Sequence, residues 1–581
     1  MNIFVKLKWF FVQEKKAYII GITMLVFVAI LQLIPPRVIG IVVDQIDEGS
    51  LTGSNLSKWV AILIASGIGM YVLRYFWRIK IYGSAVKLSR QLRYQLFDHF
   101  TEMPSSFYQR KRIGDLMAHA TNDLSAIQQT AGSGVLSLVD SLTTGGFVVL
   151  AMAYIDWRLT LFALLPMPFI AILTSYYGKL LHTRFRNAQA AFSELNDKTQ
   201  ESINGIRVIK TFGHERADIE AFRTSSQSVV EKNISVAKVD ALFDPTISIL
   251  TGLSYFISIA IGAKYVMEDQ LTIGALVSFS TYLGLLIWPM LAFGYLFNIV
   301  QRGNASYDRI SELLGEKTDI LDDTKGIARP ASGDIQFEIS SFTYPEERNS
   351  VLKNVSFVLK KGQTLGIVGK TGAGKTTLLK LLIREFDATD GTIYIGEYRI
   401  KDYTLTSLRE SIGYVPQEHF LFSATVGENI AFAKPNATQQ EIEHAAYLSH
   451  IHSDITGFTD GYKTLVGERG VSLSGGQKQR ISIARAILLN PEILILDDSL
   501  SAVDAKTEET ILQNLKRSRE NKTTIITSHR LSAVQHANLI IVLNHGEIVQ
   551  RGTHEELMDE EGWYKNMYQQ QQLEDLVEQG G

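Results

Sequence analysis

The sequence contains no cysteine among its 581 residues. This absence excludes disulfide frameworks, thiolate zinc sites and a cysteine nucleophile. A large excess of one charge is also absent, since 57 Lys and Arg face 60 Asp and Glu. Because a protein that follows nucleic-acid phosphates needs a concentrated basic surface, nucleic acid is not an expected partner. No small-residue cleavage site follows the first apolar run, so we expect that run to be retained as a helix.

Long apolar runs are present, and all of them lie before residue 300. Six runs each approach the roughly 20 residues that an α-helix needs to cross a bilayer. They are residues 17–36, 59–76, 135–155, 159–177, 246–266 and 273–300. Acidic residues are almost absent from these runs, which favours six transmembrane helices over buried helices of a soluble protein. The length of the chain indicates at least one further domain.

Basic residues are concentrated in two of the five connections between these runs. The connections at 77–134 and 178–245 are rich in Lys and Arg, whereas the other three are short and acidic or nearly neutral. Positively charged loops stay on the cytoplasmic side of a membrane. We therefore expect both termini and both basic connections in the cytoplasm, and a bacterial inner membrane fits this pattern.

The two basic connections keep a helical apolar period, as Leu92, Leu96 and Phe100 show in the first. We predict that the membrane helices continue beyond the bilayer there, and the alternative is a solvated helical hairpin. Short segments bounded by turns lie near the tips, at 103–115 and 212–222, opened by Pro104 and Gly213. Such projecting helix pairs need a cytoplasmic element to contact.

From about residue 333, short β-rich runs alternate with helical stretches, which indicates an α/β domain. The predicted strand 364–368 leads into Gly369-Lys-Thr-Gly-Ala-Gly374-Lys375-Thr376 and then into a predicted helix at 377–384. This strand, glycine-rich loop and helix form the context that a P-loop requires. Backbone N–H groups there can hold phosphates, Lys375 can reach the β and γ phosphates, and the Thr376 hydroxyl can bind Mg²⁺.

Two further motifs follow the P-loop. Residues 493–497 form an apolar run that ends in Asp497, which suits a carboxylate near Mg²⁺. Between the loop and this run, Leu473-Ser-Gly-Gly-Gln477 opens a predicted helix at 478–489 and presents a second helix N-terminus fit for phosphate. Two phosphate sites per chain suggest that the second faces a nucleotide on another molecule.

Taken together, these motifs resemble the ATP-binding cassette (ABC) family, and the resemblance covers essentially the whole chain. Tyr344 matches the adenine-stacking A-loop, Gln417 the Q-loop, residues 473–477 the signature, residues 501–504 the D-loop and His529 the switch histidine. Six helices before one cassette look like an exporter half-transporter. The resemblance implies an all-α six-helix transmembrane domain of the type IV exporter fold, followed by an α/β P-loop nucleotide-binding domain.

The resemblance also implies which residues act. Two chains would hold ATP and Mg²⁺ between the P-loop of one cassette and the signature of the other, and the tip segments would be coupling helices. The implied nucleotide-binding residues are Tyr344, Gly369, Lys370, Thr371, Gly372, Ala373, Gly374, Lys375, Thr376, Thr377, Ser474, Gly475, Gly476 and Gln477. The implied metal-binding residues are Thr376, Gln417 and Asp497, and the implied catalytic residues are Asp498, His529 and Gln417. The expected domains are 1–314 for the membrane, a linker at 315–332, the cassette at 333–572 and a tail at 573–581.

One residue departs from the family pattern. Asp498 follows Asp497 at the position where hydrolytic members usually carry Glu. The shorter side chain withdraws the carboxylate by roughly 1.5 Å, although a bridging water or a backbone shift could compensate. The signature is intact, and this combination resembles one half of the heterodimeric bacterial multidrug exporters of the BmrC or EfrC type. We therefore expect a degenerate site here and a Glu-bearing partner, with a homodimer as the alternative.

The sequence indicates the substrate only weakly. The last two apolar runs are rich in aromatic residues, including Tyr255, Trp288 and Tyr295, which could bind flat amphipathic cations or serve only in packing. Asp140 is the one acidic residue within a predicted span, so it is a functional candidate, although pairing with a basic neighbour would also explain it. Multidrug efflux is the expected function. A lipid or peptide exporter, or a non-transporting ABC regulator, is the alternative.

Overall fold

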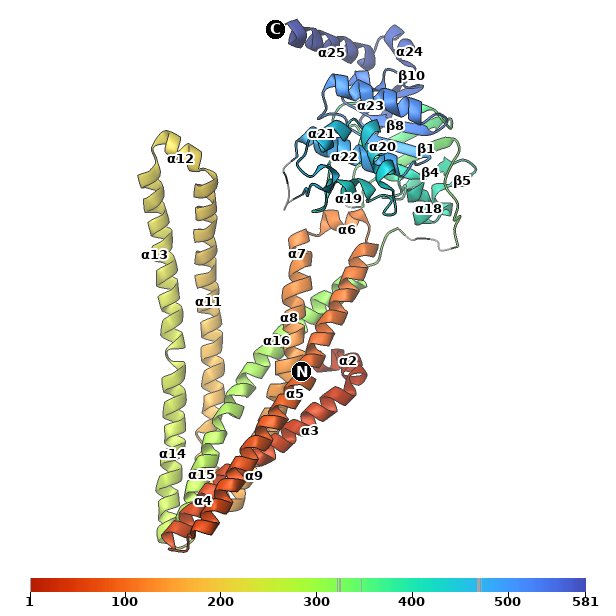
Figure 1. The fold of residues 1–581 in the computed structure, drawn as a ribbon. Coiled ribbons are helices and arrows are strands. Elements are labelled where there is room, and N and C mark those ends of the chain that lie inside the picture. The colour runs from red at the N-terminus through yellow and green to blue at the C-terminus, as the bar shows by residue number, and fades with distance from the viewer. Residues whose placement is uncertain are drawn as a thin grey trace. The chain divides into compact units, whose positions relative to one another are not determined.

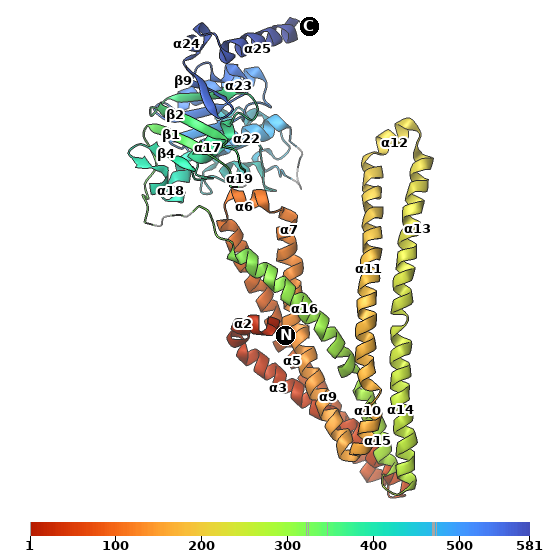
Figure 2. The same ribbon diagram turned by 180° about the vertical axis from the view of Figure 1, so that it is seen from behind.

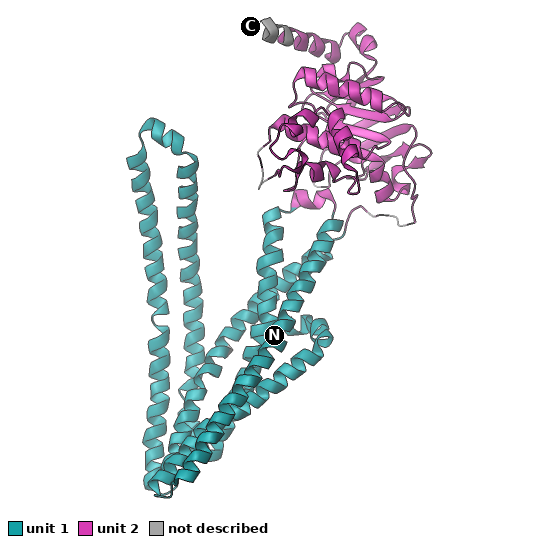
Figure 3. Cartoon of the chain, in the orientation of Figure 1, with its two compact units in different colours: residues 1–103, 111–317 teal, residues 104–110, 318–581 magenta. Residues whose placement is uncertain are grey.

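The computed structural model describes residues 2–320, 322, 325–345, 347–467, 471 and 473–580, without the side chains of residue 293 and residues 575–580. The chain divides into two compact units. Residues 1–103 and 111–317 form the first, which we call the helical unit, and residues 104–110 and 318–581 form the second, the sheet unit (Figure 3). The chain thus enters the sheet unit briefly at residues 104–110 before returning to the helical unit.

The helical unit is built from helices that follow one another closely along the chain (Figure 1). In chain order they are α1 (Asn2–Lys6), α2 (Lys8–Gln13), α3 (Lys15–Gln32), α4 (Ile34–Asp47), α5 (Gly53–Glu102), α7 (Ile113–Ala118), η1 (His119–Asp123), α8 (Leu124–Gln129), η2 (Thr130–Gly134), α9 (Val135–Ile155), α10 (Trp157–Leu164), α11 (Met167–Asn204), α12 (Ile206–Phe212), α13 (Glu215–Asp240), α14 (Phe243–Met267), α15 (Ile273–Leu285) and α16 (Ile287–Gly315). Among the described residues, 6 helical stretches are long and apolar enough to cross a membrane, which confirms the predicted six. They are Lys15–Asp47, Gly53–Glu102, Ile113–Ile155, Trp157–Asn204, Glu215–Met267 and Ile273–Gly315.

Prolines explain several of the short breaks within these stretches. Proline has no N–H to donate, so it interrupts the ladder of backbone hydrogen bonds when it lies inside a helix. The break between α3 and α4 comes directly before Pro35 and Pro36, and the break between α15 and α16 comes just before Pro289. At the first break, the Leu33 carbonyl accepts a 2.7 Å hydrogen bond from the hydroxyl of Tyr282 in α15.

Both basic connections are helical and extend far beyond the apolar segments. Helix α5 is continuous over 50 residues. Helices α11 and α13 lie side by side in both views and are joined by α12 at their shared end (Figure 1, Figure 2). The second basic connection therefore forms a long helical hairpin.

The structure corrects the position of the second tip segment. The sequence pattern placed it at 212–222, opened by Gly213, but the short helix α12 covers Ile206–Phe212 and ends at Gly213. Gly213 adopts a left-handed conformation with φ 64°, which is typical of a residue that ends a helix and not one that begins it. Residues 215–222 instead belong to the long helix α13.

The sheet unit contains two sheets and the helices around them. Its elements are α6 (Ser105–Arg110), β1 (Ile335–Phe342), β2 (Leu352–Leu359), β3 (Thr364–Gly369), α17 (Lys375–Leu382), β4 (Asp390–Ile395), β5 (Tyr398–Arg399), η3 (Ile400–Asp402), α18 (Leu405–Glu410), β6 (Ile412–Val415), α19 (Val426–Ala431), α20 (Gln439–Leu448), α21 (His452–Thr456), η4 (Gly461–Lys463), α22 (Gly475–Leu488), β7 (Ile493–Asp497), α23 (Ala505–Ser518), β8 (Thr523–Thr527), η5 (Leu531–Val534), β9 (Leu539–Asn544), β10 (Glu547–Gly552), α24 (His554–Asp559) and α25 (Trp563–Gly580). A 4-stranded sheet has the order β2-β1-β4-β5, and a 6-stranded sheet has the order β10-β9-β3-β8-β7-β6. The strands from β9 to β6 are parallel, so their carboxyl ends share one edge.

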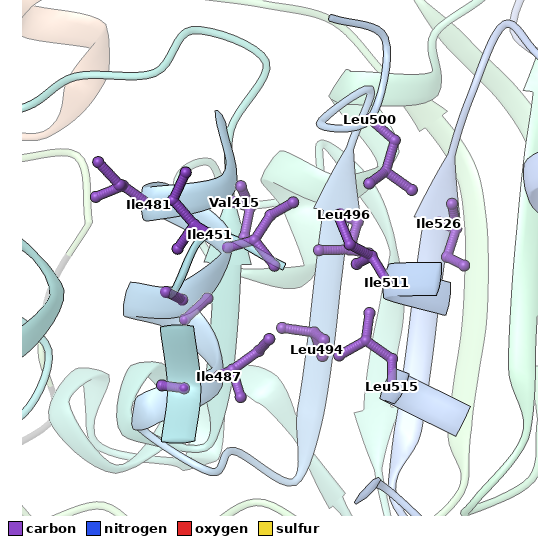
Figure 4. Close-up of a cluster of buried hydrophobic side chains, with 14 of the residues drawn as sticks. Val415, Ile451, Ile481, Ile487, Leu494, Leu496, Leu500, Ile511, Leu515 and Ile526 are labelled. Atoms are coloured by element: carbon purple, nitrogen blue, oxygen red, sulfur yellow. The ribbon is translucent and has the colours of Figure 1, made fainter. Parts of the chain in front are cut away.

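The core of the sheet unit fixes that edge. Every residue of β7 is buried, as in a strand that is covered on both of its faces. Figure 4 shows Leu494 and Leu496 of β7 packed with Ile511 and Leu515 of α23 in one buried cluster. The end of β7, where Asp497 lies, is therefore held by a dry, well-packed layer. The predicted linker and tail boundaries remain predictions, and α25 continues past residue 573.

Candidate active site

The glycine-rich loop joins β3 to α17. Gly369 has φ 144°, and a Cβ there would lie 2.2 Å from the Leu543 carbonyl oxygen, so a side chain does not fit. Gly374 precedes the first helical residue with φ 101°. Both conformations favour glycine. The helix begins at Lys375, two residues before the predicted start, and its free N–H groups face the loop, as binding of an anion requires.

Lys375 lies inside this loop. Its side chain is buried, and its Nζ donates to the carbonyl oxygens of Gly369 at 2.8 Å and Lys370 at 3.2 Å. Burial lowers the pKa of Lys375, and the negative charges of Asp498 and Asp497 oppose that shift. The ammonium thus lies inside the loop, where phosphate oxygens can replace the two carbonyl oxygens as its hydrogen-bond acceptors.

Asp497 ends β7 as predicted and is almost completely buried. Its carboxylate accepts hydrogen bonds from the hydroxyls of Thr376 at 3.2 Å, Thr527 at 2.7 Å and Tyr414 at 3.1 Å. Burial and the Asp497 charge raise the pKa of Tyr414 above its ordinary value, so this phenol stays a donor. Sequence reasoning missed Tyr414, although it opens the same Tyr-Val-Pro-Gln segment that contains Gln417.

The neighbouring Thr376 and Asp497 suit a magnesium ion. Hydroxyl and carboxylate oxygens are ligands that Mg²⁺ prefers, and it takes its remaining ligands from phosphates and water. Among the described residues, no three His, Asp or Glu side chains form a metal-binding group of their own. These two side chains therefore fit an ion that arrives with a nucleotide. Gln417 bonds to the Asp498 carboxylate and takes no part in the hydrogen bond between Thr376 and Asp497.

Asp498 has a different environment from Asp497. Its φ is 47°, a left-handed conformation held by hydrogen bonds from its N–H to the carbonyl and hydroxyl of Thr527. Its carboxylate accepts a long hydrogen bond, 3.5 Å from Gln417 Nε2, and another from the backbone N–H of His529. Burial raises the pKa of Asp498, while the charge and backbone N–H of His529 oppose the shift. The structure thus brings together Asp498, Gln417 and His529.

Tyr344 contacts the first helical turn after the loop. Its hydroxyl shares a 2.9 Å hydrogen bond with the Thr377 hydroxyl. Its ring packs edge-on against Phe342 and Phe386, with centroids 5.0 and 5.1 Å away. An aromatic surface thus lies beside the loop, as stacking of a base requires. Sequence reasoning missed Phe386, which no motif marks.

The signature forms the N-terminus of α22. Ser474 caps the helix, and its side chain and that of Gln477 exchange hydrogen bonds with each other's backbone N–H groups. Ser474 and Gly475 are exposed, and a Cβ on Gly476 would meet the Ala502 carbonyl oxygen at 2.8 Å. The Ser474 and Gln477 side chains bond to each other's backbone, and Gln477 Nε2 also donates to the Asp454 carboxylate at 3.2 Å. The two helix N-termini are therefore separate.

Gln479 connects the signature helix to the end of β7, and sequence reasoning missed it. It is fully buried, its Nε2 donates to the Asp498 carbonyl at 3.4 Å, and its Oε1 accepts from the Ala502 N–H at 3.1 Å. Its position two residues after the signature was the available signal. A shift of residues 498–502 would therefore strain or break the hydrogen bonds that tie them to α22.

This constellation is that of an ATP-binding cassette, and comparison with known proteins agrees. Residues 18–290 match the ABC transporter transmembrane region, and residues 352–501 match the ABC transporter cassette. The chain is 48% identical over 99% of its length to the multidrug resistance-like ATP-binding protein MdlA of Escherichia coli (strain K12), covering 97% of that protein. It is 46% identical to YheI of Bacillus subtilis (strain 168), a probable multidrug resistance ABC transporter ATP-binding/permease protein, over 99% of this chain and 98% of that one.

A solved structure agrees in fold. The structure of a bacterial Atm1-family ABC exporter with ATP bound has a TM-score of 0.78 and 25% sequence identity, covering 96% of this chain and 99% of that one. The chain belongs to the ABC transporter family, and its fold is the type IV exporter fold. It is a multi-pass membrane protein with an ATPase cassette, and its fold is one that dimerises.

Proposed function

We propose that this chain is one half of a heterodimeric multidrug exporter of the BmrC or EfrC type. It uses ATP and Mg²⁺ to move small amphipathic compounds out across the bacterial inner membrane, with both termini in the cytoplasm. The observation that carries the proposal is Asp498, which stands where hydrolytic members of the family usually have Glu, in a chain whose signature is intact. The similarity to two multidrug-type relatives supports the substrate class.

The residue roles follow from the geometry of the site. Lys375 and the N–H groups of residues 369–377 bind the phosphates, Tyr344 stacks on the adenine, and Thr376 and Asp497 hold Mg²⁺ together with Gln417. Because its side chain is one methylene shorter than the Glu of hydrolytic members, the Asp498 carboxylate reaches less far toward the attacking water and acts inefficiently as its base. His529 lies close to Asp498, so we assign it to the γ-phosphate as well. This chain therefore contributes one slow site.

The partner supplies the fast site. Ser474 and Gly475 are exposed, so they are free to close on a nucleotide held by the phosphate loop of a second chain. That second chain carries a Glu after its own Walker B aspartate. A general base contributes about 10² to 10⁴ in rate, so most turnover of the complex arises there.

A co-purification experiment tests this proposal. The purified chain alone should hydrolyse ATP slowly, and co-expression with a Glu-bearing half-transporter should restore turnover and dye efflux from vesicles. Fast hydrolysis by a verified homodimer would contradict the heterodimer. Fast hydrolysis without efflux of any dye would favour a non-transporting regulator, and efflux of lipids or peptides alone would favour the other exporter classes.

Asp140 marks the substrate site that we propose within the membrane. Its carboxylate is half-buried and accepts a 2.9 Å hydrogen bond from Thr144, and within the described residues no Lys or Arg pairs with it. The next residue, Ser141, donates to the Pro289 carbonyl at 3.2 Å, beside the exposed ring of Trp288. A carboxylate near an exposed indole suits a flat organic cation. Asp140→Asn should reduce efflux of cationic dyes and spare neutral ones, and equal loss of both would remove Asp140 from the substrate site.

A further inference from the structure

A groove of about 630 Å³ lies between the N-terminal helices and α5. Its α2 side includes Phe10 and Glu14, and its α5 side includes Lys87, Arg90 and Tyr94. All of these residues belong to the helical unit, so the groove is formed by one compact body. None of the roles proposed above uses it.

Helices α1 and α2 have two opposite apolar faces. Ile3, Leu7 and Phe10 have no exposed surface, because this face packs on the bundle. A second row at the same three- to four-residue spacing is exposed: Val5 at 69%, Trp9 at 37% and Val12 at 57%. A short helix with an exposed apolar row, a tryptophan and neighbouring lysines is typical of a segment that lies in the membrane interface. The groove is therefore beside lipid.

Contacts between α3 and α5 place the groove outside the predicted apolar runs, on their cytoplasmic side. The predicted apolar run of the first span begins at residue 17, and a Cβ on Gly21 would meet Ile81 at 2.7 Å. Gln13 of α2, four residues before the start of that run, donates to Gln91 of α5 at 3.4 Å. On the α3 side the groove thus begins about one helical turn, roughly 5 Å, outside the apolar run, and on the α5 side it begins at Lys87, past the end of the second run at residue 76. Both sides lie outside the apolar core of the bilayer, toward the headgroups and the cytoplasm.

The charge of the groove is positive. Glu14 is its acidic residue, and its carboxylate is already paired with Lys87 Nζ at 3.0 Å. Arg90 is exposed, and no acidic side chain among the described residues pairs with it. Lys15 and Lys16 are exposed next to Glu14. A guanidinium binds a phosphate through two parallel hydrogen bonds, which makes Arg90 the main candidate donor.

We propose that this groove binds the phosphate headgroup of an anionic phospholipid, with Arg90 as its principal ligand. The exposed row of Val5, Trp9 and Val12 keeps the acyl chains close, which favours a lipid over free phosphate as the source of the anion. The proposal depends on membrane placement of the N-terminal helices and not on the partner, the nucleotide or the exported compound.

Native mass spectrometry of the detergent-purified full chain tests this inference. The probes are phosphatidylglycerol, phosphatidylcholine and inorganic phosphate, each titrated against wild type, Arg90→Gln and the matched control Arg93→Gln, which changes an exposed arginine of α5 outside the groove lining. We expect phosphatidylglycerol to bind in preference to phosphatidylcholine, and Arg90→Gln to weaken that binding about fivefold. Arg93→Gln should leave it unchanged, and inorganic phosphate should not compete at millimolar concentration.

Each contrary result is decisive. Equal binding of the two lipids, or equal phosphatidylglycerol affinity in wild type and Arg90→Gln, would overturn the site. Competition by inorganic phosphate at the affinity of the lipid would overturn the lipid assignment. ATP hydrolysis with a Glu-bearing partner, measured on the same variants, keeps the two proposals apart, because neither substitution touches the cassette.

Discussion

Two adjacent aspartates at the end of β7 differ in how their carboxylates are held. Asp497 is buried and accepts hydrogen bonds from three hydroxyls, so its carboxylate is fixed. Asp498 is in a left-handed conformation, and its carboxylate accepts hydrogen bonds from the Gln417 amide, at 3.5 Å, and from the backbone N–H of His529. A fixed carboxylate such as that of Asp497 suits a metal ligand. A general base must also reach the attacking water, and the short side chain of Asp498 limits that reach.

Substitution of Lys375 or Asp497 should weaken nucleotide binding at this chain's own site. Lys375→Ala removes the buried cation of the loop, and Asp497→Asn removes the negative charge next to Thr376. Loss of a hydrogen bond to a charged group should weaken ATP binding about tenfold or more. Site-resolved photolabelling measures this, with Lys360→Ala as the exposed lysine control. Unchanged labelling of both variants would remove the two residues from the site.

Lengthening the side chain at position 498 should speed hydrolysis. Asp498→Glu adds one methylene and moves the carboxylate roughly 1.5 Å toward the attacking water, within hydrogen-bond reach. ATP hydrolysis by a preparation of this chain shown to be dimeric should rise at least about tenfold. Asp498→Gln has the same length without the charge and should stay slow. If the Glu and Gln variants matched wild type, the side-chain length would not be what limits this site.

At the scale of elements, α6 is the part of the first 317 residues that groups with the sheet unit. It follows Pro104 directly, and its Phe107 is 1% exposed. The chain leaves α5, passes through α6 in the sheet unit and continues into α7 in the helical unit. This short helix therefore belongs by packing to the unit that carries the nucleotide site, although its sequence neighbours belong to the other.

Truncation of Phe107 should uncouple transport from hydrolysis. Phe107→Ala removes a buried ring, a change that costs about 3–5 kcal/mol in packing. Dye efflux by the two-chain complex should fall more than its ATP hydrolysis. Tyr108→Ala, which truncates the partly exposed neighbouring ring, serves as the control. A parallel loss of both activities in Phe107→Ala, with correct membrane insertion, would mean that α6 supports folding only.

The elements that could be predicted were those with a strong local signal. The strand ending at Asp497 has the predicted bounds because an unbroken apolar run is bounded by Pro491 and by a carboxylate. The second tip was misplaced because a glycine can either open a turn or end a helix, and only its φ of 64° decides. Tyr414 and Phe386 could not be predicted, since they meet Asp497 and Tyr344 through tertiary packing.

At the scale of the whole molecule, one chain is incomplete. Its phosphate loop and its signature are separate helix N-termini within the sheet unit, and the exposed Ser474 and Gly475 have no nucleotide phosphate of their own chain to bind. A dimer resolves this, because each loop then meets the signature of the other chain. In the heterodimer that we propose, one site has Asp498 and the other has the partner's Glu, so the two sites should differ in rate. The asymmetry between them is the central claim.

The most direct test compares the two sites by mutation in the two-chain complex. We would measure steady-state ATP hydrolysis and dye efflux for Asp498→Asn, Ser474→Ala and Gly475→Asp. Thr438→Ala is the control for Ser474→Ala, because it removes the same kind of helix cap from α20. Asp498→Asn should change turnover less than about twofold, whereas the signature variants should lose about 10² in rate. Ser474→Ala removes a hydroxyl donor to the partner's γ-phosphate, and Gly475→Asp places a negative charge beside it. If Asp498→Asn abolished hydrolysis as fully as the signature variants did, Asp498 would be a working base and the degenerate-site account would be wrong.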